Sequence, residues 1–382
     1  MEQTVDVIIV GGGVIGCSIA YHLSKRGIKV RLLERGRIAS EASSAAAGML
    51  AAQAEFIDSV PLFDWARQSR AMFPALTADL QAHSGMEIGL VQQGLLRVAT
   101  SEEDVLRYHA QAELQRQSGE SAQWLSAQEA LALEGTLASD VYGALYLEND
   151  HQVVAPSLTL AYASAAAALG AEIREHSEVQ ELLREGGRIT GVRMQDGIHR
   201  CQQVIIASSI WSQALLRTVG YDLPLYPVKG ECIAVRTNKP LIRRTIYTDN
   251  CYLVPKANGE LLIGATVTPH TMQRHVTVGG ILALMGVAER LIPSIRGATW
   301  IRTWSGLRPQ TPQGLPYIGN HPELAGLMIA AGHYRNGILL SPLTGSVMAD
   351  LVEGIELAAD LTAFQVPAMR WSKDQEMTGV GI

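Results

Sequence analysis

The sequence is poor in cysteine and has no clustered pair of thiols. Its four cysteines are spread over 382 residues, and none lies in a Cys-x-x-Cys pattern; they are Cys17, Cys201, Cys232 and Cys251. Scattered thiols favour neither a disulfide framework nor a zinc or iron–sulfur site. We therefore expect no bound metal.

The sequence also lacks a basic block and a long apolar run. Its 31 basic and 37 acidic residues give a net charge of −6, which disfavours nucleic acid as a partner. The apolar segments stay well short of the roughly 18 to 20 residues that a membrane span needs. The first residues, MEQTVDVIIV, show no cationic leader pattern. We expect a soluble cytoplasmic protein without a membrane span.

What the sequence does contain is a large apolar fraction. Hydrophobic residues make up 47% and charged residues 18%, which supports a large buried core. A chain of 382 residues is too long for one simple core. Two closely packed domains are expected.

The first 35 residues hold the most informative pattern. Residues 5–10, VDVIIV, predict a buried parallel strand. A helix over residues 14–24 and a second strand over 28–33 are expected after it, and Glu34 ends that strand. Between the first strand and the helix lie three glycines in the spacing Gly-x-Gly-x-x-Gly, which are Gly11, Gly13 and Gly16. Together these features predict a dinucleotide-binding unit.

Each residue type in this unit has a physical role. Gly11 permits a tight turn, Gly13 leaves room for a pyrophosphate, and Gly16 lets the helix approach the strand. The first N–H groups of the helix and its dipole favour phosphate, and the Glu34 carboxylate accepts hydrogen bonds from ribose hydroxyls. The same carboxylate would repel the 2′-phosphate of NADP. The pattern alone does not separate NAD from FAD.

The segment after Glu34, RGRIASEASSAAAGML, is built from small residues. Such residues would let the backbone pass close to a large flat ligand; they include Ser43, Ser44, Ala47 and Gly48. An alanine-rich helix over residues 45–54 is the alternative from the residues alone.

A second α/β unit is expected over residues 151–212. A helix is predicted over residues 158–169, and two strands are joined by a turn at Asp196-Gly197. The last strand ends in Ala207-Ser208-Ser209, and Trp211 after it is interpreted as a packing residue.

The third quarter of the chain alternates in the manner of antiparallel strands. Residues 252–256 and 260–267 predict a hairpin around Ala257-Asn258-Gly259. Tyr247, Cys251 and Tyr252 are candidates to face a pocket, although alternation places Tyr247 and Cys251 on the opposite face from Tyr252 unless a bend or bulge intervenes. From sequence alone, core packing is an equal alternative for either tyrosine.

Two further segments carry candidate functional residues. Arg308, in Leu307-Arg308-Pro309, stands where a strand gives way to a loop, and a guanidinium matches the two oxygens of a carboxylate. Arg302 is interpreted as a surface residue. Residues 332–345, GHYRNGILLSPLTG, predict a glycine-rich turn that opens a buried helix.

Three groups of segments carry a resemblance to a known family. They are GGGVIG…LLER with SSAAAGM, PVKGEC with YTDNCYLVPK and LLIGATV, and GLRPQTPQGLPYIG with AAGHYRNGILLSP. In these motifs the chain resembles the D-amino-acid oxidase and sarcosine oxidase group of FAD flavoproteins, and within it the glycine oxidases of thiamine biosynthesis. The motifs span nearly the whole chain. Ser209 departs from the glycine that is usual in the group.

The resemblance implies a fold of α/β plus α+β class. A Rossmann-like FAD-binding domain would comprise residues 1–85, 150–217 and 300–364. A discontinuous, D-amino-acid oxidase-like substrate domain with an antiparallel sheet would comprise residues 86–149 and 218–299. Residues 365–382 would form a C-terminal tail.

The resemblance implies non-covalently bound FAD. Four free N–H groups at the start of the last helix would stabilise negative charge on the reduced flavin, those of Asn336, Gly337, Ile338 and Leu339. The residues expected to contact the cofactor are Gly11, Gly13, Val14, Ile15, Gly16, Glu34, Arg35, Ala42, Ser43, Ser44, Ala47, Gly48, Met49, Val179, Ala207, Ser208, His333, Tyr334, Arg335, Asn336, Gly337, Ile338 and Leu339.

The resemblance also implies the reaction. Arg308 and Tyr252 would bind the carboxylate of glycine, sarcosine or a small D-amino acid, with the amine near Arg335. These three are the expected catalytic residues, and Tyr247 and Val267 are further expected substrate contacts. A hydride would pass to flavin N5. The resulting imine would yield glyoxylate and ammonia or supply thiamine thiazole synthesis, and oxygen would regenerate FAD with release of hydrogen peroxide.

Several alternatives stay open at this stage. The chain could be a sarcosine or D-amino-acid oxidase, a quinone-linked dehydrogenase of the same group, or a non-catalytic FAD-binding subunit of a complex. A nicotinamide dehydrogenase is the least favoured. By analogy with the group we expect a homo-oligomer, in particular a tetramer, and a hand-over of the imine to thiazole synthase.

Overall fold

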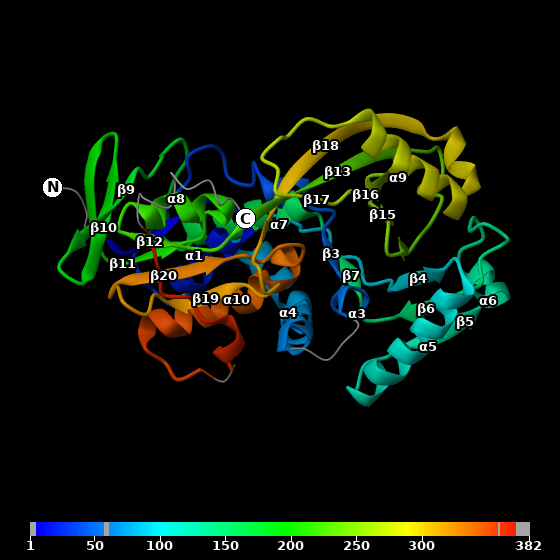
Figure 1. Ribbon diagram of the computed structural model, residues 1–382, viewed down its shortest axis with the longest axis horizontal. Coiled ribbons are helices and arrows are strands. Elements are labelled where there is room, and N and C mark those ends of the chain that lie inside the picture. Colours follow the sequence, from blue (N-terminus) through cyan, green and yellow to red (C-terminus); the bar gives the residue numbers. More distant parts are fainter. Residues whose placement is uncertain (1–4, 57–60, 358–359, 372–382) are drawn as a thin grey trace.

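The computed structural model describes residues 5–56, 61–357 and 360–371. Two large β-sheets form the framework of the molecule, one in each half of the elongated shape seen in Figure 1. The expected tail lies partly outside the described residues, because residues 372–382 are not among them.

The first sheet is mainly parallel. Its strand order is β19-β20-β11-β1-β2-β8, and along this order β19 (Tyr317–Asn320) runs antiparallel to β20 while the other neighbouring strands pair in parallel. The parallel strands are β20 (Leu327–Ala331), β11 (Gly197–Ile206), β1 (Val5–Val10), β2 (Val30–Leu33) and β8 (Glu172–Arg174). A side hairpin of β9 (Glu181–Glu185) and β10 (Arg188–Met194) extends from β11. The predicted turn at Asp196-Gly197 is confirmed, because it joins β10 to β11.

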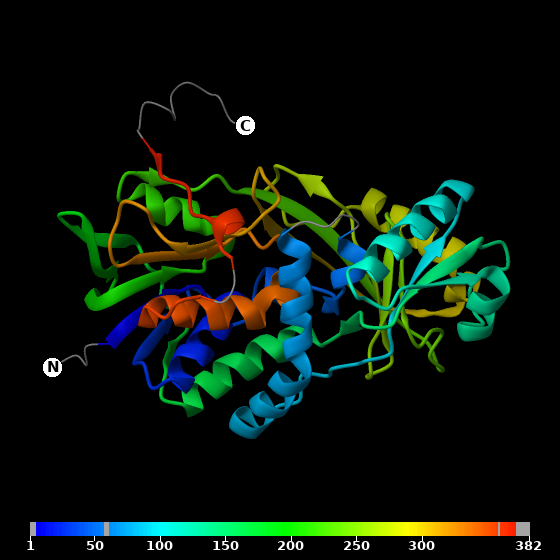
Figure 2. The ribbon, with the colours of Figure 1, turned by 90° about the horizontal axis from the view of Figure 1, so that it is seen from below.

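Helices cover this sheet and bury its β-branched strands. Helix α1 (Val14–Lys25) packs against α7 (Ala155–Ala168) and α10 (Gly337–Glu353). Figure 2 shows α4 (Pro61–Ser84) crossing α7 and α10 on the outer side. The short α8 (Ser212–Arg217) lies near the pair β12 (Tyr221–Asp222) and β21 (Met369–Arg370).

The second sheet is mainly antiparallel. Its order is β17-β13-β16-β15-β14-β4-β6-β5, with β18 also paired to β13. The strands are β17 (Thr268–Pro269), β13 (Tyr226–Arg236), β16 (Glu260–Gly264), β15 (Tyr252–Pro255), β14 (Thr245–Tyr247), β4 (Leu95–Ala99), β6 (Gly143–Leu147), β5 (Gln123–Ser126) and β18 (Thr299–Gln310). Three helices pack on it, α5 (Glu102–Gln117), α6 (Ala127–Leu133) and α9 (Val278–Leu291).

The expected domain boundary at residue 300 needs a correction. Strand β18 (Thr299–Gln310) pairs with β13 along its whole length, so residues 300–310 belong to the antiparallel sheet. The expected boundary assigned the whole segment from residue 300 to the FAD-binding domain because the last helix of that segment belongs there.

Small elements lie between the two sheets. They are α2 (Ala42–Ala45), β3 (Met49–Leu50), α3 (Ala52–Glu55) and β7 (His151–Gln152), and β3 pairs with β7. The alternative of a continuous helix over residues 45–54 is therefore wrong, because α2 ends at Ala45 and the backbone is extended at Ala46, where ψ is 140°.

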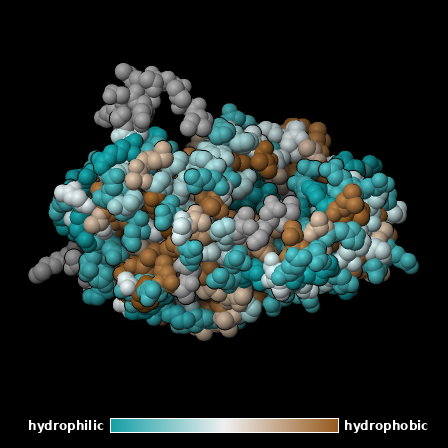
Figure 3. Space-filling view, turned by 60° about the horizontal axis from the view of Figure 1, so that its bottom comes forward, coloured by the Kyte–Doolittle hydropathy of each residue, from teal (hydrophilic) through white to brown (hydrophobic). Residues whose placement is uncertain are grey.

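The surface is mixed in character. On the face shown in Figure 3, hydrophobic residues form small groups scattered among polar ones. Among the helices of the described residues, none is long and apolar enough to cross a membrane.

Candidate functional site

The glycines between β1 and α1 allow backbone segments to approach one another closely. Gly11 has φ +116°, and a Cβ there would lie 2.5 Å from the carbonyl oxygen of Ala207. A Cβ on Gly16 would lie 2.0 Å from the carbonyl oxygen of Gly11. Gly16 therefore acts through packing, while Gly13 lines a cavity, and a Cβ added there would lie 3.3 Å from Ser43 Oγ.

Glu34 is held in place at the end of β2. Its carboxylate accepts hydrogen bonds from the N–H groups of Gly12 and Gly36, both at 2.7 Å. Each carboxylate oxygen can accept a second bond. Glu34 is thus fixed as an acceptor at the cavity wall, as its predicted contact with ribose requires.

The first cavity has a volume of about 440 Å³ and runs along this motif. It contains many of the expected cofactor residues: Gly11, Gly13, Glu34, Arg35, Ala42, Ser43, Val179, Ala207 and Ser208. Trp211 also lines it, and the Arg35 guanidinium lies 3.9 Å from the centre of the Trp211 ring. The interpretation of Trp211 as a packing residue is wrong. Ser209, which lines the same cavity, has φ +58°.

The second cavity joins α1 to the start of α10. Residues at both helix starts line it, together with residues of α2 and the end of β11; the expected cofactor residues among them are Gly13, Val14, Ile15, Ala42, Ser43, Ala207, His333, Tyr334, Arg335, Gly337 and Ile338. The Val14 N–H donates to Ser43 Oγ at 2.9 Å, so this donor already has a partner within the protein. Ile15 and Gly16 follow in the first turn, where N–H groups have no acceptor within the helix.

The turn before α10 is held by backbone contacts. Tyr334 has φ +49°, and its N–H donates to the Pro309 carbonyl at 3.0 Å. The Asn336 N–H donates to the His333 carbonyl at 2.9 Å. The expectation of four free N–H groups is therefore corrected to the three that open α10, those of Gly337, Ile338 and Leu339. Burial lowers the pKa of His333 to about 3, so its ring is neutral.

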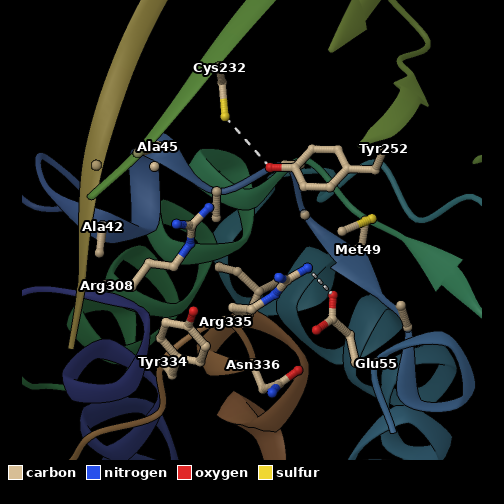
Figure 4. Close-up of a pocket in the computed structure, with 17 residues that line it drawn as sticks. Ala42, Ala45, Met49, Glu55, Cys232, Tyr252, Arg308, Tyr334, Arg335 and Asn336 are labelled. Atoms are coloured by element: carbon tan, nitrogen blue, oxygen red, sulfur yellow. Dashed lines mark hydrogen bonds and ion pairs between the residues drawn. The ribbon is translucent and has the colours of Figure 1, made fainter. Parts of the chain in front are cut away.

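The third cavity brings the expected substrate residues together (Figure 4). Arg308 comes from β18, Tyr252 from β15 and Arg335 from the turn before α10, and all three point into it. The other expected residues that line it are Ala42, Ala47, Gly48, Met49, Tyr334, Asn336 and Ile338. Ala42 lines all three cavities, so they lie next to one another, and together we call them the hollow.

Arg308 occupies space that a glycine leaves open. A Cβ at Gly230, on the neighbouring strand, would lie 2.2 Å from Arg308 Nη1. The same Nη1 donates to the Thr266 carbonyl at 3.3 Å. These contacts leave most of the guanidinium donors to the cavity.

Tyr252 lies against a second glycine of the sheet. A Cβ at Gly264 would lie 2.6 Å from its phenol oxygen. The phenol is 3.6 Å from Cys232 Sγ (Figure 4). Burial raises the pKa of Tyr252 well above its usual value, so the hydroxyl stays protonated and can donate to a carboxylate.

Arg335 is already paired with a carboxylate. Its Nη2 lies 2.8 Å from Glu55 Oε1 and 3.0 Å from the Tyr247 hydroxyl, and that hydroxyl lies 3.0 Å from Glu55 Oε1. The charge of Glu55 raises the pKa of Arg335 further. Tyr247 thus reaches the cavity through Arg335 and is not itself among the lining residues.

The two tyrosines share a face. The alternation argument put them on opposite sides, but a tight turn over residues 248–251 lies between them and Tyr247 pairs directly with Tyr252. Residues directly opposite in an antiparallel pair point to the same side of the sheet. The required bend is therefore a full reversal of the chain.

Some expected contacts lie outside the hollow. Val267 is 52% exposed and does not line the third cavity, because the chain leaves the sheet between β16 and β17. Ser44 is exposed and its hydroxyl donates to the Glu41 carbonyl at 2.8 Å. Leu339 is buried in the core. Gly48 lines the third cavity, but its lack of a side chain is needed elsewhere, since a Cβ would lie 2.0 Å from the Val153 carbonyl oxygen.

Sequence reasoning missed several residues of the third cavity. Glu55 was missed because a single acid after a short helix has no distinctive pattern. Cys232 was treated only as a scattered thiol. Gly230 and Gly306 lie inside strands, where glycine is unfavourable, and this signal could have marked a close approach. A Cβ on Gly306 would lie 2.5 Å from the Ala45 side chain.

Comparisons with known proteins identify the family of the chain. The FAD dependent oxidoreductase family matches residues 6–351. The glycine oxidase of Geobacillus kaustophilus is 48% identical over 369 residues, covering 96% of this chain and 97% of that protein. The crystal structure of glycine oxidase from Geobacillus kaustophilus has a TM-score of 0.93, covering 96% of this chain and 99% of that one.

A second kind of relative is longer than this chain. The bifunctional protein ThiO/ThiG of Trichormus variabilis is 34% identical over 355 residues, which cover 92% of this chain and 53% of that protein. The chain therefore belongs to the FAD dependent oxidoreductase family, in the group that contains the glycine oxidases.

Proposed function

We propose that this chain uses FAD to oxidise glycine to glyoxylate, ammonia and hydrogen peroxide. The observation that carries the proposal is the third cavity, in which Arg308 and Tyr252 face Arg335 beside the start of α10. The relative from Geobacillus kaustophilus, named a glycine oxidase, supports glycine as the substrate. Sarcosine and small D-amino acids are further proposed substrates.

The hollow fits FAD in shape and chemistry. It extends from the Glu34 carboxylate, past Gly13 and the start of α1, to the start of α10. An acceptor for ribose, a helix start for phosphate and a second helix start for a ring that gains negative charge suit such a dinucleotide. When bound, FAD supplies the acceptor for the electrons of the substrate's α-C–H bond and passes them on to oxygen.

Arg308 and Tyr252 bind the substrate carboxylate. The Arg308 guanidinium offers paired N–H donors, and the protonated Tyr252 phenol offers another. Both side chains belong to the antiparallel sheet, so they hold the carboxylate as one rigid unit.

Arg335 lies on the amine side of the substrate. Because Glu55 balances its charge, Arg335 competes less for the carboxylate than a free cation would. The N–H groups at the start of α10 stabilise negative charge that develops nearby.

Further proposals concern the setting of the enzyme. We place it in the cytoplasm as a homo-oligomer, in particular a tetramer. A hand-over of the glycine imine to thiazole synthase is supported by the bifunctional relative, in which a segment similar to this chain shares one polypeptide with a second part. We assign residues 1–85, 150–217 and 311–364 to the FAD-binding domain and the two sheet-forming segments between them to the substrate domain.

The visible spectrum of the purified protein tests the proposal. In an anaerobic cuvette, glycine should bleach the yellow flavin band, and air should restore it with release of hydrogen peroxide. A flavin band that ignores glycine would contradict glycine as the substrate. Bleaching that air cannot reverse would contradict oxygen as the acceptor.

A further inference from the structure

Lys256 stands at a junction that the reaction chemistry does not explain. It follows β15 directly, four residues after Tyr252, and its side chain turns toward the small elements between the sheets. Its Nζ donates to the Ala47 carbonyl at 2.6 Å, the Val153 carbonyl at 2.9 Å and Gln152 Oε1 at 2.8 Å. Three acceptors match the three N–H donors of an ammonium group.

The surroundings of this cation are unusual. All three acceptors are uncharged, and burial lowers the pKa of Lys256 to about 7. Keeping a lysine ammonium away from water without a carboxylate partner is costly. The contacts of Lys256 therefore cost desolvation free energy, and packing alone does not explain why a lysine stands here.

The segments that Lys256 joins belong to different parts of the site. Ala47 lines the third cavity beside Gly48 and Met49. The Val153 N–H donates to the Gly48 carbonyl at 2.8 Å, and β3 pairs with β7. Figure 1 shows β3 and β7 between the two halves of the molecule.

Gln152 reinforces the same link. Its Nε2 donates to the Pro255 carbonyl at 2.8 Å while its Oε1 accepts from Lys256. The end of β15 is thus joined to β7 by two side chains. Tyr252, on the same strand, binds the substrate carboxylate in the proposed function.

We propose that Lys256 is a positioning residue that sets the place of the bound substrate relative to the cofactor. This role rests on the proposed function, and it explains how the substrate-binding residues are aligned with the cofactor-binding unit. Arg308 and Tyr252 lie on one sheet, whereas Val153 leads into α7, which packs against α1 of the cofactor-binding unit. Lys256 fixes the distance between these two groups.

Lys256→Met should separate chemistry from binding. Methionine keeps the length of the chain and loses all three donors. Because Arg308 and Tyr252 stay together on their sheet, the KM for glycine should change less than about threefold. The limiting rate of reduction should fall by about 10- to 100-fold, the scale expected when reacting groups are misplaced by about 1 Å.

Two variants provide the comparison. Lys256→Arg keeps a cation with several donors and should recover much of the rate. Lys239→Met removes an exposed lysine of the same half and should leave rate and KM unchanged.

The experiment measures anaerobic reduction of the holoenzyme by glycine, with the rate expressed per bound flavin. FAD dissociation constants from fluorescence titration and thermal unfolding midpoints are recorded for each variant. If Lys256→Met loses stability or FAD affinity but keeps its rate per bound flavin, Lys256 is merely structural and the inference is overturned. If wild type itself is not reduced by glycine, the proposed function fails instead.

A second variant guards against poor folding of the first. Gln152→Leu removes one acceptor of Lys256 and the donor to Pro255, so it should lower the limiting rate in the same direction with KM preserved. An unchanged rate in Gln152→Leu would also overturn the inference.

Discussion

At the scale of single residues, the substrate cavity depends on glycines, whose lack of a side chain leaves space for their neighbours. Gly230 and Gly264 leave space for Arg308 and Tyr252, and Gly306 leaves space for Ala45. Glycine weakens a strand interior because it packs poorly and gains more entropy on unfolding. These three positions on neighbouring strands are explained by the side chains that occupy the space, which at Gly230 and Gly264 are the expected substrate-binding groups.

Adding one methyl group at Gly230 should therefore impair substrate binding. In Gly230→Ala the new Cβ would lie 2.2 Å from Arg308 Nη1, so the guanidinium must move. We expect kcat/KM for glycine to fall by about 10- to 100-fold, since a charged hydrogen bond contributes about 1.5 to 3 kcal/mol. Steady-state kinetics measure this. Gly279→Ala is the control, because nothing lies within 4 Å of its Cβ position, and equal effects in both variants would refute the explanation.

Removal of the Arg308 guanidinium should have a larger effect. Arg308→Ala loses the paired donors, so kcat/KM for glycine should fall by about 100-fold or more. Arg302 lies on the same strand, but its half-exposed side chain pairs with Glu260. Arg302→Ala should change kcat/KM less than about threefold, because exposed ion pairs contribute little. Full activity of Arg308→Ala would remove Arg308 from the site.

A physical reason explains why some site residues could be predicted from the sequence and others could not. Arg308 and Tyr252 could be singled out because their chemistry suits a carboxylate and their motifs resemble the family. Glu55 could not, because its role arises from contact with Arg335, 280 residues away in sequence. Trp211 was misjudged because an indole beside a strand end is equally suited to packing.

At the scale of elements, short segments place the long-range contacts. Helix α3 contains only Ala52–Glu55 and ends with the carboxylate that pairs with Arg335. Its first turn is held by Asp150, which accepts from the N–H groups of Gln53 and Ala54 at 2.8 to 3.2 Å. Asp150 also lies 2.7 Å from the buried Arg70.

Loss of Asp150 should destabilise this part of the fold. Asp150→Ala removes the cap of α3 and one of the partners of Arg70, and breaking a buried ion pair costs about 3 to 5 kcal/mol. We expect urea unfolding to show a loss near the lower end of this range, because Glu120 still pairs with Arg70. Glu148→Ala, at an exposed position nearby, should have little effect. Equal stability of the two variants would show that Asp150 is not needed.

Long periodic elements were predictable and short ones were not. The strand over residues 5–10, the helix from Val14 and the hairpin of β15 and β16 follow from local patterns and are confirmed. The segments over residues 42–55 depend on contacts with β7 and α4, so composition alone left a helix over residues 45–54 open as an alternative. The reversal between Tyr247 and Tyr252 was hidden because alternation assumes an unbroken strand.

At the scale of the whole molecule, the fold class and the family followed from motifs spread along the chain. The match over residues 6–351 confirms the resemblance. The position of β18 could not be predicted from the sequence, because its pairing with β13 joins residues 63 (Arg236 and Thr299) to 84 (Tyr226 and Gln310) positions apart. Non-local pairing of this kind is decided by the assembled core.

Acid should weaken the fold before most carboxylates titrate. Burial lowers the pKa of His22 and His333 to about 3, and His151 and His321 are lowered as well. Below about pH 6.5 these histidines bind protons in the unfolded chain but stay neutral in the folded chain. The free energy of unfolding therefore falls as the pH falls. Each fully shifted histidine contributes about 1.4 kcal/mol per pH unit.

Urea unfolding between about pH 7 and pH 5, with FAD held in excess, measures this slope. A variant carrying His22→Gln and His333→Gln should show a shallower dependence than wild type. The same slope in both proteins would mean that other groups control acid stability.

The pairing of β13 with β18 also limits where the chain can change in length. Arg308 lies opposite Val228, and Gly306 opposite Gly230. Because side chains alternate, one inserted or deleted residue in this stretch would turn Arg308 to the other face of the sheet. A bulge already lies between Ala234 and Val235, beyond these positions. Insertions and deletions among relatives should therefore collect past that bulge and in the loop over residues 237–244, and be excluded around Gly230 and Arg308.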